Sequence, residues 1–196
     1  RDLHDSVSQS LFSASIITES LPALWKQNPD RVMPLLIDLH DLIKGITAEM
    51  RILLWELRPA NLVTTDLDKL LTHLVDAVQG RTKLAVTLTV DGVHKLPPDV
   101  HIAFYRVAQE ALNNIVKHSR ATKVSLHLYR VAEQTTLRIH DNGQGFDIEQ
   151  SSSGIGLESM RERAQMVGAV FGVTSEPGQG TEITFTWKTS VLGNDL

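Results

Sequence analysis

The stretch DNGQGF, residues 141–146, places a carboxylate at the end of a strand-like run and two glycines directly behind it. Two further glycine pairs follow along the chain, in GIGL at 154–157 and in GQGT at 178–181. Glycine permits a positive φ and lets the backbone approach a ligand closely. Each stretch alone is also explained by a simpler feature such as a hairpin turn. In this order and within one domain, the three stretches predict a nucleotide pocket.

A predicted helix from Pro98 to about His118 supplies the other polar residues of this pocket. Asn114, Lys117 and His118 follow Glu110 by four, seven and eight positions, which puts all of them on one helix face. An oxygen of Asn114 suits Mg2+, which takes few protein ligands besides phosphate oxygens and water. Lys117 and His118 can meet phosphate charge. Taken alone, the same polar stripe is simply the exposed face of an amphipathic helix.

Two helical patterns open the chain. Residues 1–26 place apolar side chains at alternating spacings of three and four, and residues 31–57 repeat the pattern. The turn-forming cluster at 26–30 joins them, which predicts an antiparallel helical hairpin. Two helices cannot bury both apolar stripes between them. We therefore expect a homodimeric four-helix bundle.

The segment 58–61 (RPAN) breaks the helical pattern and marks the expected domain boundary. Beyond it the fold class is α+β: a mixed, largely antiparallel sheet covered on one face by helices. Helices are expected at 67–78, 98–118 and 155–167, and strands at 83–90, 123–129, 135–141, 170–175 and 181–187.

Composition excludes several classes of function. The formal charge of -4 and the isoelectric point near 6.1 show no electrostatic footprint for nucleic acid. The chain has no cysteine, which excludes disulfides and thiolate chemistry and fits a cytoplasmic protein. No apolar run approaches the ~20 residues that span a bilayer, so this chain is expected to make no membrane contact. Because it opens at Arg1 rather than at a methionine, we expect a fragment of a longer protein, in which a membrane anchor would lie outside this chain.

Other nucleotide and metal motifs fit poorly. The P-loop pattern is absent, and the glycines at 154–156 lack the third glycine and the parallel βαβ unit of the dinucleotide fingerprint. A calcium loop starting at Asp141 lacks the later ligand positions.

Taken together, these stretches resemble the Bergerat ATP-binding fold shared by DNA gyrase, histidine kinases and the mismatch-repair ATPases. Residues 109–118 (QEALNNIVKH) resemble its N box, and 141–146 its first glycine box. Residues 154–164 (GIGLESMRERA) resemble the second glycine box with the Leu-x-x-Met-Arg-Glu-Arg extension of one kinase subfamily, and 178–181 the last box.

The resemblance implies a role for each matching residue. It implies that Asn114 binds Mg2+, that Asp141 reads the adenine amine, and that Thr181 supports the adenine contact. The glycines would let an ATP lid move. The residues expected to contact ATP are Asn114, Lys117, His118, Asp141, Gly143, Gly145, Gly154, Gly156, Leu157, Gly178, Gly180 and Thr181.

The segment LHDSVSQ, residues 3–9, is similar to the phospho-acceptor helix of the nitrate-sensor type of histidine kinases. It carries the His-Asp-x-x-x-Gln pattern in place of the commoner His-Glu box. We expect His4 to accept the phosphoryl group of ATP while Asp5 orients the ring and takes or stabilises the proton on its other nitrogen. Gln9 would position water for removing phosphate from a response-regulator aspartate.

Glu110 matches the position where ATP-hydrolysing relatives keep a glutamate that activates water. It would coordinate Mg2+ through water, act as a base, or do both, and the sequence leaves these alternatives open. The catalytic residues expected from the sequence are therefore His4, Asp5, Gln9 and Glu110.

The predicted protein is a cytoplasmic kinase core that autophosphorylates on His4 and transfers the phosphoryl group to a response regulator. The predicted domains are 1–58 for dimerisation and phosphotransfer, 59–66 as linker, 67–190 for ATP binding and 191–196 as tail. One alternative is an ATPase of the same fold that drives conformational change, which explains Glu110 but leaves the segment 3–9 unused. Another is a non-catalytic dimeric scaffold that binds a response regulator.

Overall fold

The computed structural model describes residues 2–57, 59–92, 95–148 and 155–189. The chain divides into two compact units. One comprises residues 1–64 and 72–83, and the other comprises 65–71 and 84–196.

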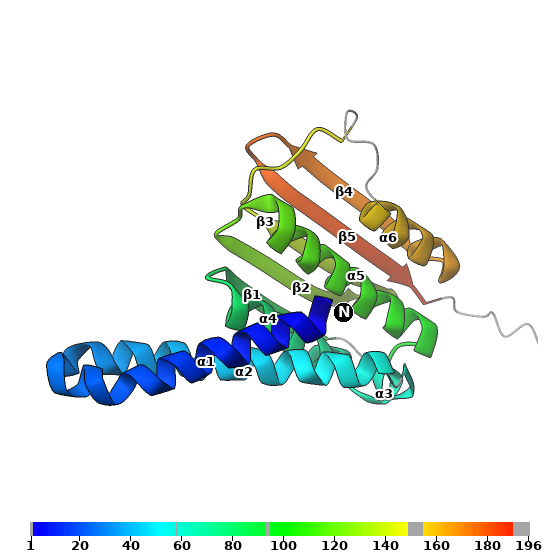
Figure 1. The fold of residues 1–196 in the computed structure, drawn as a ribbon. Coiled ribbons are helices and arrows are strands. Elements are labelled where there is room, and N and C mark those ends of the chain that lie inside the picture. The colour runs from blue at the N-terminus through cyan, green and yellow to red at the C-terminus, as the bar shows by residue number, and fades with distance from the viewer. Residues whose placement is uncertain (1, 58, 93–94, 149–154, 190–196) are drawn as a thin grey trace, which may run out of the picture. The chain divides into compact units, whose positions relative to one another are not determined.

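The first unit is built on the helices α1 (Asp2–Gln27) and α2 (Val32–Leu57), joined through the short 3-10 helix η1 (Pro29–Arg31). The two long helices run antiparallel and side by side (Figure 1), so the predicted hairpin is confirmed. Pro22 lies inside α1 without ending it.

A short helix, α3 (Pro59–Thr64), lies where the sequence predicts a break in helical structure. Proline is well tolerated at the first position of a helix, because its missing N–H would have no partner there. The proline therefore begins a new helix at this position.

The helix α4 (Leu67–Arg81) packs its C-terminal part against α2 in the first unit. Gly45 and Gly80 meet at the crossing so closely that a Cβ on either would overlap the backbone of the other. Lys44 pairs with Asp76 at 2.8 Å beside this crossing. The contact joins α4 to a hairpin that is distant in sequence.

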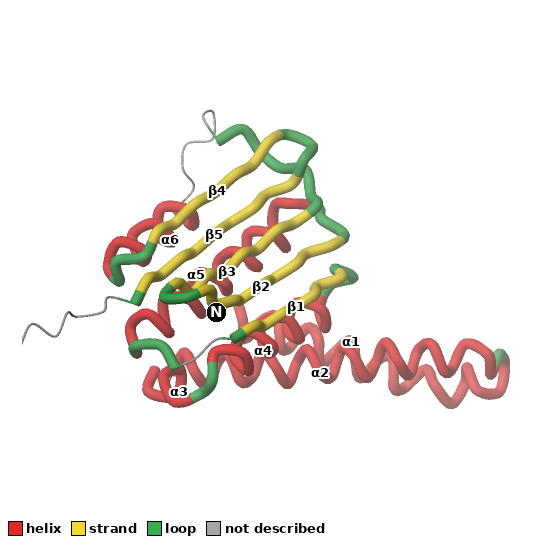
Figure 2. Tube along the Cα trace, turned by 180° about the vertical axis from the view of Figure 1, so that it is seen from behind, coloured by secondary structure: helices red, strands yellow, loops and turns green. Residues whose placement is uncertain are grey.

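The second unit contains a five-stranded sheet with the strand order β1-β2-β3-β5-β4 (Figure 2). Only β1 and β2 pair in parallel, which confirms the mixed, largely antiparallel sheet. Its strands are β1 (Ala85–Asp91), β2 (Lys123–Val131), β3 (Gln134–Asp141), β4 (Val170–Glu176) and β5 (Gly180–Lys188).

The helices α5 (Pro98–Asn114) and α6 (Ile155–Met166) cover one face of this sheet (Figure 1). Phe104 of α5 and Phe185 of β5 meet edge to face with ring centroids 4.8 Å apart. Leu112, Leu128 and Leu137 are also almost fully buried in this core. Alternation along the strands directs every second side chain toward the helices, where these residues form the core.

The helix α5 continues as a π-helix, η2 (Ile115–Ser119), where the sequence predicts a single helix to about residue 118. Arg120 follows with a φ of 54°, in the left-handed region. Single-turn π segments often occur at functional sites, because they redirect the side chains that follow.

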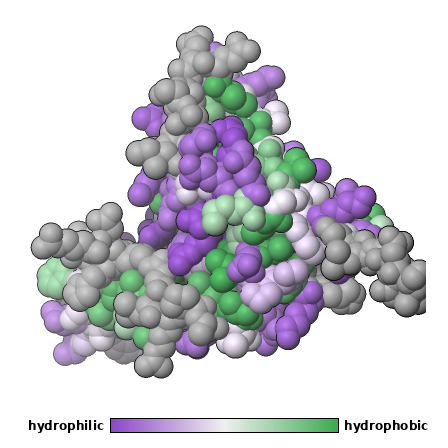
Figure 3. Space-filling model, turned by 90° about the vertical axis from the view of Figure 1, so that its right-hand side faces the viewer, coloured by the Kyte–Doolittle hydropathy of each residue, from purple (hydrophilic) through white to green (hydrophobic). Residues whose placement is uncertain are grey.

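Large apolar side chains are exposed in both units, among them Phe12, Ile37 and Leu54 in the hairpin and Val131 and Met166 in the sheet unit. Figure 3 shows hydrophobic residues reaching the surface among hydrophilic ones on one face of the molecule. Among the residues described, no helix combines the length and apolar character needed to cross a bilayer.

Candidate functional site

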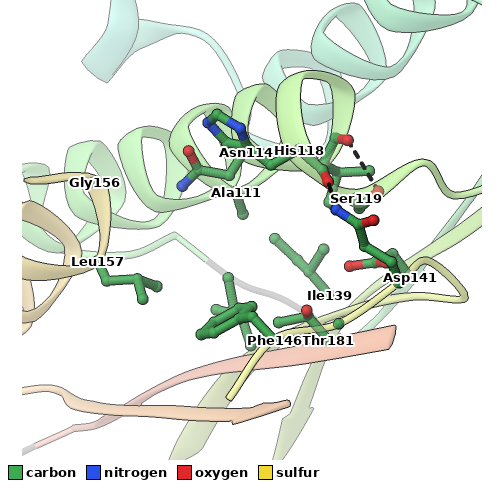
Figure 4. A pocket seen from close by; sticks show the side chains of 14 residues that line it. Ala111, Asn114, His118, Ser119, Ile139, Asp141, Phe146, Gly156, Leu157 and Thr181 are labelled. Carbon is green, nitrogen blue, oxygen red and sulfur yellow. Dashed lines mark hydrogen bonds between the residues drawn. The ribbon is translucent and has the colours of Figure 1, made fainter. Parts of the chain in front are cut away.

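A cavity of about 540 Å³ lies in the sheet unit, between α5 and the strands β3 and β5. Figure 4 shows Asp141 and Thr181 toward one end of it, and Asn114, Gly156 and Leu157 toward the other. Its lining residues are Ala111, Asn114, Ile115, His118, Ser119, Ile139, Asp141, Gln144, Gly145, Phe146, Gly156, Leu157, Thr181 and Ile183. All four motifs quoted from the sequence therefore supply residues that line one cavity.

Asp141 is the buried charge of this cavity, with 1% of its surface exposed. It ends β3, and its Oδ1 accepts a hydrogen bond from the backbone N–H of Gly143 at 2.7 Å. Burial raises the pKa of the Asp141 carboxyl, while the N–H groups of Gly143 and Thr181 act in the opposite direction. A buried carboxylate lining an open cavity is suited to accept a hydrogen bond from a ligand that carries an N–H group.

The glycine boxes are interlocked through their backbones. Gly145 has a φ of 57° and Gly180 a φ of 80°, both in the left-handed region. A Cβ on Gly145 would overlap the carbonyl oxygen of Glu176, and one on Gly180 would overlap that of Asp141. Glycine is therefore required at both positions by conformation and by space.

Gln144, which the sequence analysis did not select, connects three parts of the site. Its backbone N–H donates to the carbonyl of Ser119 at 2.7 Å, and its own carbonyl accepts from Gly178 at 2.6 Å. Its side-chain Nε2 donates to the carbonyl of His118 at 2.8 Å. Gly178 thus lies in the turn before β5 and ties that turn to the first glycine box without lining the cavity.

The start of α6 lies against the polar face of α5. A Cβ on Gly156 would overlap Oε1 of Glu110, and it would also come within 3.0 Å of Nδ2 of Asn114. Asn114 and His118 line the cavity, as the sequence predicts. Lys117 is exposed on the surface and is not among the lining residues.

Other predicted site residues lie outside the described part of the chain. This holds for Gly154 and for the side chains of His4, Asp5 and Gln9. The backbone of these last three residues belongs to α1.

Several lining residues were not selected from the sequence, and most of them are apolar. Ile139 lies two residues before Asp141 on β3, and strand alternation alone would have placed it on the same side. Ser119 lies at the end of the π-helix, and its hydroxyl donates to the carbonyl of Ile115 at 2.9 Å. Phe146, the last residue of the first glycine box, belongs to the same wall.

Two family profiles match this chain. Residues 99–191 match the histidine kinase-, DNA gyrase B- and HSP90-like ATPases, and residues 1–62 match a histidine kinase family. The first match supports the use of ATP. Together with the hairpin and the cavity, they show that the chain belongs to the sensor histidine kinases of the nitrate-sensor type.

Individual relatives agree with this assignment. The sensor protein VraS of Staphylococcus saprophyticus is 37% identical over 185 residues, which are 93% of this chain and 52% of that protein. The VraS of Staphylococcus aureus is 36% identical over the same shares. The chain thus spans about half the length of these relatives.

Solved structures show the same fold at low identity. A blue-light activated histidine kinase of Erythrobacter litoralis has a TM-score of 0.57 at 18% identity, covering 95% of this chain and 64% of that one. The histidine kinase domain of the same kind of protein has a TM-score of 0.52 at 16% identity, over 91% of this chain and 94% of that one.

Proposed function

We propose that this chain is the cytoplasmic kinase core of a two-component sensor histidine kinase, which uses ATP to phosphorylate itself on His4. The observation that carries the proposal is the single cavity that holds Asp141 and Thr181 toward one end and Asn114 toward the other. A nucleotide needs such a space, with an acceptor for its base and polar groups for its phosphates. We assign 1–58 to dimerisation and phosphotransfer, 59–66 to a linker, 67–190 to ATP binding and 191–196 to a tail.

The donor set fits ATP. Asp141 would accept the adenine amine, with Thr181 beside it. Asn114 and His118 line the other part of the cavity and would meet the phosphates, together with Lys117 from the neighbouring surface. The helix α6 begins at Ile155, next to the cavity-lining Gly156, and backbone N–H groups at a helix N-terminus favour bound anions.

Mg2+ would be held by the amide oxygen of Asn114, with Glu110 acting through water, and it would neutralise phosphate charge when bound. The carboxylate of Glu110 lies close to both Gly156 and the helix face of Asn114. We assign to Glu110 this role, that of a base, or both.

The phosphoryl transfer joins a ring nitrogen of His4 to the γ-phosphorus and breaks the bond from that phosphorus to the β,γ-bridging oxygen, releasing ADP. Asp5 takes or stabilises the proton on the other ring nitrogen. An imidazole with an unperturbed pKa of ~6.5 is mostly neutral near pH 7, so it is a competent nucleophile. Such a transfer depends on positioning and charge neutralisation more than on covalent help.

The phosphoryl group would next pass from His4 to an aspartate of a response regulator. Gln9 would position the water that later removes it from that aspartate. Both reactions follow from the family resemblance of residues 4–9.

A second copy of this chain is the partner that best fits the hairpin. Leu36, Ile43, Met50 and Leu54 are all at least 40% exposed, and they recur on α2 at spacings of seven, seven and four. This spacing puts them on one stripe of the helix. Pairing two such stripes forms a four-helix bundle.

The proposal is tested with purified protein, radiolabelled ATP and Mg2+. We expect acid-labile, base-stable label on the protein, and loss of at least 99% of it in His4→Gln. His40→Gln is the matched control, because His40 is exposed on α2 and is also followed by an aspartate, at 3.2 Å. It should label like the wild type.

Other results would favour the alternatives. Steady phosphate release without labelled protein would favour an ATPase that drives conformational change. Failure to bind any adenine nucleotide in a calorimeter would favour a non-catalytic scaffold. Label on His4→Gln at the level of the wild type would overturn the assignment of the phospho-acceptor.

A further inference from the structure

Three polar residues form a row across neighbouring strands at the end of the cavity that we assign to the nucleotide base. Ser175 of β4 pairs with Thr181 of β5, and Thr181 pairs with Asp141 of β3. Thr181 and Asp141 line the cavity, whereas Ser175 lies behind them with 8% of its surface exposed. Ser175 belongs to none of the motifs that the sequence analysis selected.

The hydroxyl of Ser175 has three hydrogen-bond partners. It accepts from the backbone N–H of Phe146 at 2.9 Å and donates to the carbonyl of Gly180 at 3.0 Å. It also lies 3.0 Å from Oγ1 of Thr181. One short side chain thus connects the end of the first glycine box to the start of β5.

Counting protons decides the direction of the bond to Thr181. A hydroxyl has one proton and two lone pairs. The carbonyl of Gly180 can only accept, so it takes the proton of Ser175, and the N–H of Phe146 fills one lone pair. The other lone pair is left for Thr181, which must therefore donate. With its proton turned toward Ser175, Thr181 offers only lone pairs to the cavity.

We propose that Ser175 is a positioning residue for base selection: it holds the Thr181 proton away from the cavity, so that Thr181 and Asp141 form a pair of acceptors. Such a pair selects a purine that carries an amino group at this edge and rejects one that carries a carbonyl oxygen. An amino group brings two N–H donors, whereas a carbonyl oxygen would bring a third acceptor to a buried site. This inference rests on the proposed binding of ATP in the cavity.

The selection arises from buried polar groups. A site built to hydrogen-bond one group strongly rejects an analogue that leaves its polar groups unpaired. If Thr181 were free to rotate its proton toward the cavity, it could donate to a carbonyl oxygen and the rejection would weaken.

The experiment compares the binding of ATP and inosine triphosphate, each with Mg2+, to the whole chain by calorimetry. Inosine triphosphate carries a carbonyl oxygen in place of the adenine amino group. We expect the wild type to prefer ATP by about tenfold or more. In Ser175→Ala the ratio of the affinity for ATP to that for inosine triphosphate should fall by about three- to tenfold, because the hydroxyl of Thr181 can then turn its proton toward the cavity. Ser175→Thr keeps the hydroxyl and should keep the ratio.

A double-mutant cycle separates this effect from a structural one. Thr181→Val should also narrow the ratio, and adding Ser175→Ala to it should change the ratio no further, since Ser175 acts through Thr181. Thr174→Ala is the matched control, because Thr174 is the exposed neighbour of Ser175 on the same strand. It should leave both affinities unchanged.

The results that oppose the inference differ from those that oppose ATP binding itself. If Ser175→Ala weakens both nucleotides by the same factor, Ser175 only supports the fold of the site and the inference is wrong. If the wild type binds neither nucleotide, the proposed function has failed first.

Discussion

The two units of this chain differ in how completely each buries its own apolar residues. In the sheet unit, Phe104, Leu128 and Phe185 are fully buried between the sheet and its helices. In the hairpin, Ile43 and Leu54 remain 50% and 57% exposed. The sheet unit therefore encloses an apolar core of its own, although Val131 and Met166 are exposed on its surface, whereas Ile43 and Leu54 belong to an exposed apolar stripe along α2. Predictions for the two units should accordingly be independent of each other.

The largest effect is expected from Ile43→Asp in the exposed stripe of α2. The substitution places an unpaired carboxylate in the proposed dimer interface twice, once for each copy. Because burying an unpaired charge costs about 3–5 kcal/mol, the dimer dissociation constant should rise by about a thousandfold or more. Sedimentation of the wild type and the variant measures the change.

Ile37→Asp is the control for this prediction. Ile37 is 55% exposed, but it follows Leu36 directly, which places it about 100° away from the stripe. It should leave the dimer intact, and ATP affinity should be unchanged in both variants. Equal dissociation by both substitutions would mean that this stripe is not the interface.

A second, somewhat smaller effect is expected in the sheet unit. Asp141→Asn keeps an oxygen for the N–H of Gly143 but removes the charge that meets the base. Loss of a charge-assisted hydrogen bond should weaken ATP binding by about 10- to 100-fold. Calorimetry measures the affinity, and sedimentation should show an unchanged dimer. A variant that bound ATP like the wild type would remove Asp141 from the site.

A third prediction concerns the crossing of α2 and α4. In Gly80→Ala the new methyl group meets the backbone of Gly45 rather than a flexible side chain. The helices must move apart, which should destabilise the hairpin unit by about 1–3 kcal/mol. Urea unfolding followed by helical circular dichroism measures the loss.

Gly172→Ala provides the comparison for this crossing. At Gly172 the added methyl group would meet the side-chain hydroxyl of Thr184, which can rotate away. Gly172→Ala should lower the free energy of unfolding by less than Gly80→Ala does. The reverse order would show that the close crossing does not limit the packing of α4.

The smallest effect is the dependence of stability on pH. Burial raises the pKa of Asp141, so the folded protein binds its proton more readily than the unfolded chain does. Stability contributed by the protonated group is therefore present below the unfolded pKa and decreases as pH rises through the folded pKa. Asp141→Asn should be more stable than the wild type at pH 7, and this difference should disappear below the ordinary aspartate pKa of ~3.9. Urea unfolding at several pH values measures it.

If Asp141→Asn remained more stable than the wild type by the same amount at the lowest pH, the buried charge of Asp141 would not be the source of the difference.

Much of the fold could be predicted because its signals are local. The alternation of three and four along 1–26 predicts a helix whatever surrounds it, and α1 follows as Asp2–Gln27. The strand at 135–141 is likewise found within one residue, as β3. Glycines that a positive φ requires, such as Gly145, were already visible as a pattern in the sequence.

The unpredicted parts depend on contacts between distant residues. Gln144 bonds to Ser119 and Gly178, and neither contact has a signature in the segment around residue 144. The division of α4 between two units depends on Gly45, which is 35 positions away from Gly80. The contacts of such segments depend on which surfaces of the folded chain meet, and no local sequence pattern encodes that.

By itself, the sequence determined the hairpin, the mixed sheet and the chemical types gathered for a nucleotide, since periodicity and glycine placement act over a few residues. The tertiary structure alone decided that β4, β5 and β3 align Ser175, Thr181 and Asp141 in one row. Strand register is set by the packing of the whole sheet, because a shift of one residue would turn every side chain to the other face. The proposed direction of the Thr181 hydroxyl proton therefore depends on how β4, β5 and the end of the first glycine box meet.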